Sequence, residues 1–220
     1  SLCRFIDMDC LIHSGNTFAY CCNSPASMHD VCGTTGDYAY DRDKVIEYGR
    51  QYYNKQDPYY PQRSYRNNCV RFASQCLYAG LGDDIIAEVY PEWHCYRNNQ
   101  RDPENPEEHD QTRSWRKTNY FYRFLMDSGL AYNTTRLYSG WDLGLMAEWF
   151  QYEPGDFLFF SNGNGADEFY HVAVVSAITE NDILFMGNTT DCFDASLTAW
   201  FQDPENQEKE VVIVCIADQG

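Results

Sequence analysis

Cys69 is the residue of this sequence whose position best suits covalent chemistry. It is the first residue of a segment with helical periodicity that runs to Ala79 and ends at Gly80. A cysteine at the start of a helix lies at the positive end of the helix dipole, beside backbone N–H groups that favour a thiolate and can hold an oxyanion. The alternative is a small buried residue on a helix face, which is our interpretation of Cys76, two turns further along the same face.

A thiol nucleophile needs a base that lies near it in space. Of the five histidines, His171 is the best placed, because it follows a Gly/Asn-rich turn and begins an apolar strand pattern that runs to Val175. A strand fixes the backbone of such a histidine, and a position at the start of the strand leaves the side chain accessible to solvent. The competing interpretation is a polar residue that only marks the end of a strand.

The second ring nitrogen of a catalytic histidine needs an orienting partner. The segment after the next predicted strand offers Asn188 as the first choice and Asp191 as the second, and both are also ordinary turn residues. Asn68, directly before the cysteine, can supply a donor for the oxyanion. The predicted site is therefore Cys69, His171 and Asn188, with Asn68 in support.

The elements that position these residues change in kind along the chain. Helical periodicity is found at 41–53, 69–79, 115–126, 141–150 and 195–201. Strand patterns follow a turn signal at 153–156 and are found at 157–160, 171–178, 183–186 and 211–216. Helices followed by antiparallel strands predict an α+β fold, with the N-terminal helices packed on a C-terminal sheet. The polar stretch 98–113 is predicted to be a surface loop.

The charge of the chain argues against some classes of partner. The 220 residues carry a formal net charge of −17, and the sequence pI is near 4.5. So acidic a surface repels phosphate backbones, and a nucleic-acid partner is not expected. No apolar run approaches the roughly 18 residues that cross a bilayer. No basic region with an apolar stretch opens the sequence, so neither a membrane span nor a signal peptide is expected within it.

Cysteine usage divides the chain into two parts. Five of the ten cysteines fall within the first 32 residues, and the Gly-Thr-Thr-Gly-Asp run at 33–37 is typical of a linker. We therefore expect a Cys-rich arm over residues 1–37 and a second domain over residues 38–220. The arm contains the donors for a structural zinc ion: Cys10, Cys21, Cys22, His29 and Cys32. Two disulfides with one unpaired cysteine, or free thiols, are the alternatives.

Six segments of the chain, in consistent order, carry a resemblance to a known family. They are Tyr40 to Val45, Asn68 to Gly80, Ser114-Trp115, Glu153 to Phe160, His171 to Val175 and Gly187 to Leu197. Together they resemble the putative amidase domain of bacteria, which is similar to papain-like cysteine peptidases, including the cysteine, histidine-dependent amidohydrolase/peptidase group of cell-wall hydrolases. The resemblance implies a papain-like fold, with Cys69 as the nucleophile, His171 as the base and a polar third residue at Asn188.

The same resemblance implies hydrolysis of amide bonds without a catalytic cofactor. Peptidoglycan peptides or other bacterial peptides are the implied substrates. The candidates for the cleft that holds them are Trp115, Tyr170 and Asp191. Such substrates favour a secreted or cell-envelope location, with the cytoplasm as the alternative.

Two departures from the family pattern leave other hypotheses open. Relatives have Thr or Ala and then Asn after the nucleophile, where this chain has Val70 and Arg71, and their third residue is often His rather than Asn. The alternative function is therefore a papain-like module that has lost its chemistry and binds a peptide or glycan in an aromatic cleft. A third hypothesis makes the Cys-rich arm an inhibitory segment that covers the cleft.

Overall fold

The computed structural model describes residues 39–60, 68–90, 93–95, 111–163 and 168–217 of the chain. The predicted Cys-rich arm, with its zinc and disulfide candidates, lies outside these residues, as does most of the predicted loop at 98–113. Within them the fold is α+β, as predicted, and is built on a six-stranded antiparallel sheet with the strand order β1-β6-β2-β3-β4-β5.

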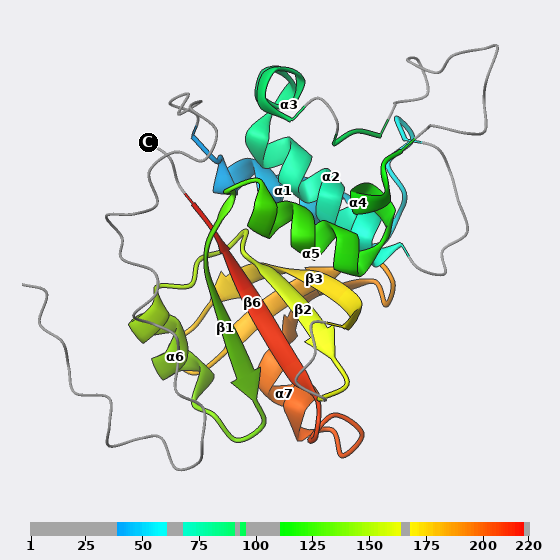
Figure 1. The fold of residues 1–220 in the computed structure, drawn as a ribbon. Coiled ribbons are helices and arrows are strands. Elements are labelled where there is room, and N and C mark those ends of the chain that lie inside the picture. The colour runs from blue at the N-terminus through cyan, green and yellow to red at the C-terminus, as the bar shows by residue number, and fades with distance from the viewer. Residues whose placement is uncertain (1–38, 61–67, 91–92, 96–110, 164–167, 218–220) are drawn as a thin grey trace, which may run out of the picture. The chain divides into compact units, whose positions relative to one another are not determined.

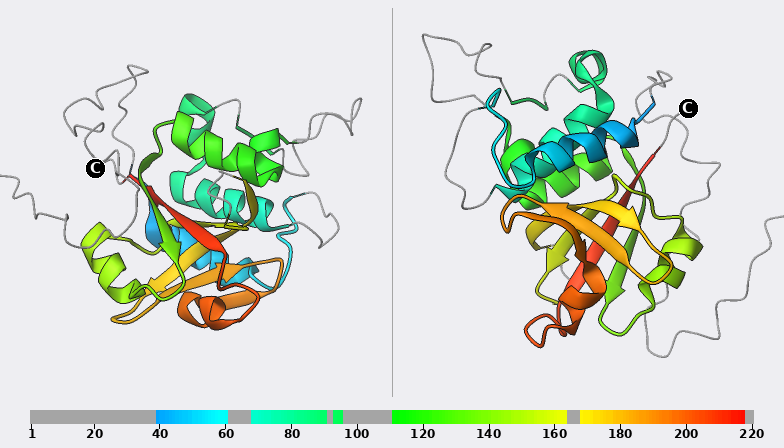
Figure 2. Two further views of the ribbon diagram at one scale, coloured as in Figure 1. Left: turned by 60° about the horizontal axis from the view of Figure 1, so that its bottom comes forward. Right: turned by 180° about the vertical axis from the view of Figure 1, so that it is seen from behind.

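The helices and strands alternate along the chain more than the sequence predicts. The strands are β1 (Ala131–Tyr138), β2 (Phe157–Ser161), β3 (Phe169–Ile178), β4 (Ile183–Gly187), β5 (Cys192–Ser196) and β6 (Glu210–Ile216). The helices are α1 (Arg42–Tyr52), α2 (Cys69–Leu81), α3 (Asp83–Val89), α4 (Arg113–Arg116), α5 (Thr118–Asp127), α6 (Leu143–Phe150) and α7 (Leu197–Gln202). Helices α1 to α5 gather on one face of the sheet, and α6 and α7 lie on the other (Figures 1 and 2).

Several predicted boundaries are wrong. The predicted helix at 195–201 begins as strand β5, and only its second part is the helix α7. The predicted helix at 115–126 is interrupted at Lys117, whose extended backbone (φ −127°, ψ 124°) separates α4 from α5. Strand β1, at one edge of the sheet, and the short helix α3 were not predicted.

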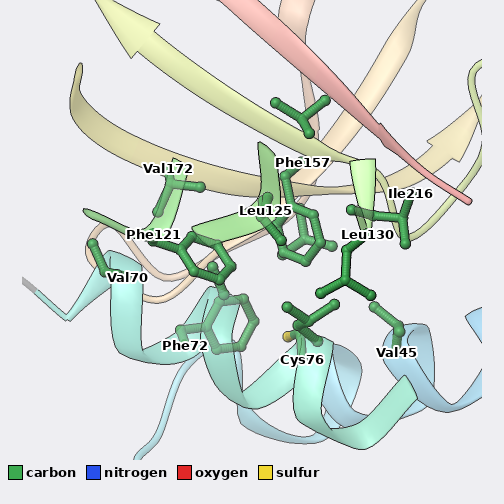
Figure 3. Close-up of a cluster of buried hydrophobic side chains, with 14 of the residues drawn as sticks. Val45, Val70, Phe72, Cys76, Phe121, Leu125, Leu130, Phe157, Val172 and Ile216 are labelled. Carbon is green, nitrogen blue, oxygen red and sulfur yellow. The ribbon is translucent and has the colours of Figure 1, made fainter. Parts of the chain in front are cut away.

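Strand alternation gives the sheet two separate apolar layers. In β2, Phe157 and Phe159 face α2 and α5, whereas Leu158 and Phe160 belong to the layer under α6 and α7. All five residues of β2 are buried, because both faces of this strand are covered. Figure 3 shows the helix-side layer, in which Phe121 of α5 lies between the sheet and α2.

Helices α1 and α2 approach closely at Gly80. A Cβ at this position would lie 2.6 Å from side-chain atoms of both Tyr40 and Val45, so only glycine fits there. The predicted role of Gly80 as the end of the helix is wrong. The helix continues to Leu81, and Gly82 ends it with a φ of 84° that disfavours other residues.

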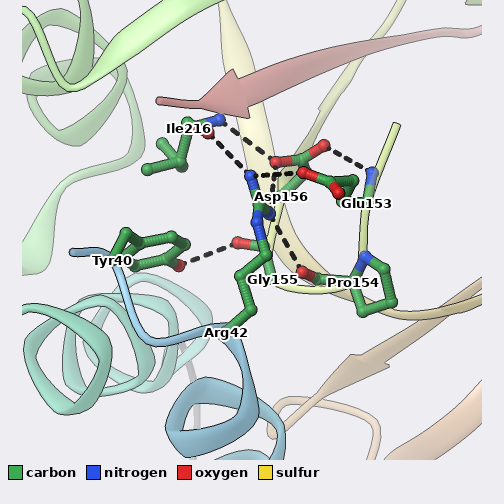
Figure 4. Close-up of polar contacts among 7 residues, drawn as sticks. All are labelled: Tyr40, Arg42, Glu153, Pro154, Gly155, Asp156 and Ile216. Carbon is green, nitrogen blue, oxygen red and sulfur yellow. Dashed lines mark hydrogen bonds and ion pairs between the residues drawn. The ribbon is translucent and has the colours of Figure 1, made fainter. Parts of the chain in front are cut away.

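A buried ion pair joins the start of α1 to the turn before β2. Arg42 Nη1 lies 3.0 Å from Asp156 Oδ1 and also donates to the carbonyl oxygen of Pro154. Arg42 Nη2 donates to the carbonyl oxygen of Ile216 at 2.7 Å, which brings the end of β6 into the same network (Figure 4). The predicted turn at 153–156 is therefore an anchoring point for three separate parts of the chain.

Backbone N–H groups complete the environment of Asp156. Its Oδ1 accepts from Ile216 N–H and its Oδ2 accepts from Glu153 N–H (Figure 4). Burial raises the pKa of Asp156 to about 6, against the lowering effects of Arg42 and of these N–H donors. At pH 7 the carboxylate is thus charged and paired with Arg42.

Candidate active site

Cys69 is the first residue of α2, as predicted. Only 5% of the residue is exposed, and the apolar face predicted for this helix is buried throughout. The helix starts directly after Asn68, whose side chain makes no capping hydrogen bond. The first-turn N–H groups therefore have no acceptor from that side chain.

Hydrogen-bond donors surround the Cys69 sulfur. The backbone N–H groups of Val172, Val70 and Cys69 and the hydroxyl of Thr189 lie close enough to favour the thiolate. Burial has the larger effect, however, and raises the pKa of the Cys69 thiol above its ordinary value. The helix terminus alone predicted a favoured thiolate, and this part of the prediction is wrong because desolvation outweighs the donors. The resting group is a neutral thiol, which must lose its proton before it can attack.

His171 lies near the start of β3, opposite Phe160 of β2. Its imidazole packs against Phe160 with ring centroids 5.3 Å apart, and its Nε2 lies 3.9 Å from the point that a Cβ on Gly187 would occupy. Burial lowers the pKa of His171 to about 4. The imidazole is therefore neutral at pH 7, which is the form that can accept a proton from a thiol.

The structure brings Cys69 and His171 to the same end of β3. The thiol lies beside the N–H group of Val172, the residue that follows His171. Val172 and His171 face opposite sides of the sheet, because Val172 belongs to the helix-side layer and His171 contacts Phe160 of the other layer. Among the described residues, no hydrogen bond joins the thiol to the imidazole.

Asn188 is buried, but not against His171. Its Nδ2 lies within hydrogen-bonding distance of the carbonyl oxygens of Tyr52, Tyr53 and Lys55, at 2.6, 2.9 and 3.1 Å, and its Oδ1 accepts from Asn68 Nδ2. In this geometry Asn188 does not orient the imidazole. It ties the end of α1 to the residue that precedes the nucleophile.

The second predicted partner, Asp191, makes no hydrogen bond to His171 in the described part of the chain either. It is exposed, and its φ of 47° places it in a left-handed turn after β4. Tyr170, a predicted cleft residue beside the base, is 46% exposed, and Lys209 lies over its ring. Both residues are accessible, as a role in a cleft requires.

Trp115 does not form a cleft wall. Its side chain is fully buried, and its ring lies behind Tyr60 and Tyr78 at centroid distances of 6.0 and 5.8 Å. The two tyrosines, which were not predicted as site residues, are the ones that face the cleft. Trp115 supports that wall from the core side.

A cleft of about 250 Å³ lies between α1, α2 and the segment that follows α1. Its lining residues are Tyr48, Asp57, Tyr59, Tyr60, Gln75, Tyr78 and Ala79, and we call it the tyrosine cleft. A smaller cavity beside it is lined by Gln56, Asp57, Tyr60, Asn68, Arg71, Gln75, Cys95 and Gln111. The two hollows share Asp57, Tyr60 and Gln75 as lining residues, and Asn68, next to the nucleophile, lines the smaller one.

The described cysteines Cys69, Cys76, Cys192 and Cys215 are free thiols. Within the described ranges, His, Cys, Asp and Glu side chains form no group of three that could hold a metal ion. No helix in this part of the chain is long and apolar enough to cross a membrane.

The comparisons with known proteins agree with the resemblance found in the sequence. A family model described as "Putative amidase domain" matches residues 39–212. No curated protein and no solved structure matches the chain. The matched range contains both Cys69 and His171.

Proposed function

Because the chain belongs to the putative amidase domain family, which indicates an amidase-type hydrolase, we propose that it cleaves amide bonds by cysteine chemistry. Cys69 is the nucleophile and His171 the base. Peptides, including those of peptidoglycan, are the proposed substrates. The proposed fold is papain-like, with helix α2 carrying the nucleophile and strand β3 carrying the base. A secreted or cell-envelope location fits such substrates.

The observation that carries this proposal is the environment of the Cys69 sulfur. A buried thiol at the first turn of a helix faces four donors, which lie on the helix, on strand β3 and in the turn after β4. These donors stabilise negative charge once the proton has left, and first-turn N–H groups can also hold the oxyanion that attack on a carbonyl creates. In a buried cysteine with only a packing role, such as Cys76, burial is the sole cause of the raised thiol pKa.

The reaction proceeds in two steps. As the substrate binds, neutral His171 takes the thiol proton, and the sulfur forms a bond to the amide carbonyl carbon. The oxyanion collapses, the C–N bond breaks, and His171 returns the proton to the leaving amine. Water, activated by the same imidazole, then hydrolyses the thioester and releases the acid. Because no hydrogen bond links the two groups at rest and the His171 ring packs against the other layer of the sheet, the first proton transfer requires the imidazole to move to the Cys69 side at the start of β3.

The test is hydrolysis of purified peptidoglycan peptides and a protein digest by matched cysteine variants. Cys69→Ala removes the nucleophile and is expected to abolish release of new amino groups. Cys76→Ala, on the same buried helix face, is the control and is expected to retain turnover. Equal turnover by Cys69→Ala and the unmodified protein would remove Cys69 from the mechanism.

A second candidate function rests on the position of Asn188. Its bonds to α1 and Asn68 leave His171 without the orienting partner that the sequence predicted. A module that binds peptides without cleaving them would show this arrangement and no turnover. Peptide binding by the unmodified protein, with the peptide recovered intact after prolonged incubation, would favour this candidate.

A further inference from the structure

The tyrosine cleft has an unusual chemical composition. Among the residues that the structure describes, seven line the cleft, of which four are tyrosines, one is a carboxylate and none is Lys or Arg. Aromatic faces attract cations through their quadrupole, and a carboxylate among them adds a full negative charge. The cleft is therefore electrostatically suited to a positively charged group.

Asp57 is a buried lining residue of this cleft. It is 6% exposed, accepts a hydrogen bond from the Tyr48 hydroxyl at 2.9 Å and accepts another from Tyr59 N–H at 2.9 Å. Burial, followed by the charge of Asp57, raises the pKa of Tyr48 well above its ordinary value. The Tyr48 phenol thus stays neutral and continues to donate to the carboxylate.

The aromatic walls are fixed by packing behind them. Tyr60 and Tyr78 both contact the buried ring of Trp115, and Tyr48 contacts Tyr52 with centroids 4.7 Å apart. Tyr59, in contrast, is 65% exposed and forms the outer rim. Walls that are already in place reduce the ordering cost of binding.

We propose that the tyrosine cleft binds the primary ammonium group of a lysine-like side chain of the substrate. At about 250 Å³ the cleft is smaller than the roughly 300–1,000 Å³ of pockets for whole small molecules, so it accommodates a single side chain. An aliphatic stem packs along the tyrosine rings while the ammonium group reaches Asp57. The acidity of the whole chain, with a net charge of −17, draws cationic substrates toward the cleft.

The position of the cleft assigns it to a residue close to the scissile bond. Gln75, which lines the cleft, follows Cys69 by six residues of α2, a distance of about 9 Å along the helix axis. An extended peptide covers ~3.3–3.6 Å per residue. Six residues also turn the helix by about 600°, so Gln75 points about 120° away from Cys69, and the path between them is longer than the axial rise. The cationic residue therefore lies about four residues from the amide that Cys69 attacks. This role as a substrate subsite rests on the proposed amide hydrolysis, whereas the binding of an ammonium group does not.

The experiment measures peptide binding to the full chain carrying Cys69→Ala, by isothermal titration calorimetry. Acetyl-Ala-Lys-Ala-amide is compared with the same peptide containing norleucine, which keeps the stem and lacks the ammonium group. The lysine peptide is expected to bind about tenfold more tightly. The norleucine peptide with a free amino terminus serves as a third probe and is expected to bind as weakly as its acetylated form.

Variants connect the preference to the cleft. Asp57→Asn keeps the shape of the side chain and is expected to remove most of the preference for lysine, and Tyr59→Ala, at the exposed rim, to weaken it. Glu47→Gln, an exposed acidic residue on α1, is the matched control and is expected to leave the preference unchanged. If Asp57→Asn does not fold, the inference is tested with Tyr59→Ala alone.

Three outcomes overturn the inference: equal affinity for the lysine and norleucine peptides, tighter binding of the free amino terminus, or a lysine preference that survives both cleft variants. Failure of the proposed function has a different signature. In that case the lysine preference remains, but the unmodified protein cleaves none of the peptides. Loss of the preference together with Cys69-dependent cleavage removes only the cleft assignment.

Discussion

The protonation of His171 provides a quantitative test of its environment. In the folded protein burial holds its pKa at about 4, whereas the ordinary value is 6.5. Between these two pH values the unfolded chain binds a proton that the folded chain excludes, so folding becomes less favourable as the pH falls. The contribution of His171 is fully present above pH 6.5 and is lost progressively as the pH drops toward 4.

The magnitude follows from the shift. One pKa unit corresponds to about 1.4 kcal/mol, and at pH 5 the linkage relation gives a loss of about 2 kcal/mol from this single group. Asp156 titrates with the opposite sign, because its folded pKa is raised to about 6 and its charged form is the disfavoured one. The contribution of Asp156 is the same in two proteins that differ only at His171, so it cancels in their difference.

The assay is urea unfolding of the unmodified protein and of His171→Gln at pH 7.5, 6 and 5. Glutamine has no charge in this range, so the variant lacks the His171 contribution at every pH. The free energy of unfolding of the unmodified protein is expected to fall by about 2 kcal/mol more than that of the variant between pH 7.5 and pH 5. Parallel pH dependence of the two proteins, or an NMR titration of His171 near pH 6.5, would refute the assignment of a buried, neutral imidazole.

Three further predictions follow from packing and charge. Gly80→Ala is expected to lower the free energy of unfolding by ~1–3 kcal/mol, measured by urea titration, because its Cβ would lie 2.6 Å from Tyr40 and Val45. Arg42→Gln is expected to cost about 3 kcal/mol in the same assay, since it leaves the carboxylate of Asp156 buried without its charged partner; a loss below about 1 kcal/mol would contradict that pairing. Iodoacetamide is expected to alkylate Cys69 more slowly than a free model thiol at pH 7, because burial raises the pKa of this thiol. Peptide mass spectrometry measures the rate of alkylation, and a rate above that of the model thiol would show a resting thiolate instead.

The parts of the fold that the sequence predicts are those with strong apolar patterns. Strands β2, β3, β4 and β6 were all predicted, because they are central or nearly central strands with largely buried residues. The edge strands β1 and β5 were not. Their residues are only partly buried, and their backbone hydrogen bonds come from pairing with β6 and β4, which leaves little trace in local sequence.

The candidate site also has parts that local sequence patterns predict and parts that depend on contacts between distant segments. The start of α2 at Cys69 could be predicted, because an apolar face with helical spacing begins there. The neighbours of Asn188 could not, since the carbonyl oxygens that it contacts lie about 135 residues away in the chain. The tyrosine cleft was missed for a related reason. Its tyrosines come from α1, α2 and the segment between them, and only the packing of these helices brings their rings together.

The pKa of Cys69 shows where local reasoning fails. A helix terminus favours a thiolate, and the N–H donors that this principle requires are present. The desolvation that opposes them depends on the burial of the whole helix against the sheet, which no spacing of residues reveals. Activation of the thiol therefore has to come from His171 and from substrate binding rather than from the helix alone.

The most direct measurement of the central proposal is to trap the acyl-enzyme. The unmodified protein is mixed with an activated ester of a lysine-containing peptide, quenched in acid after milliseconds to seconds, and digested for mass spectrometry. The proposed mechanism predicts a thioester adduct on Cys69 and none on Cys76 or Cys192. An adduct on another residue, or hydrolysis that continues unchanged in Cys69→Ala, would contradict it.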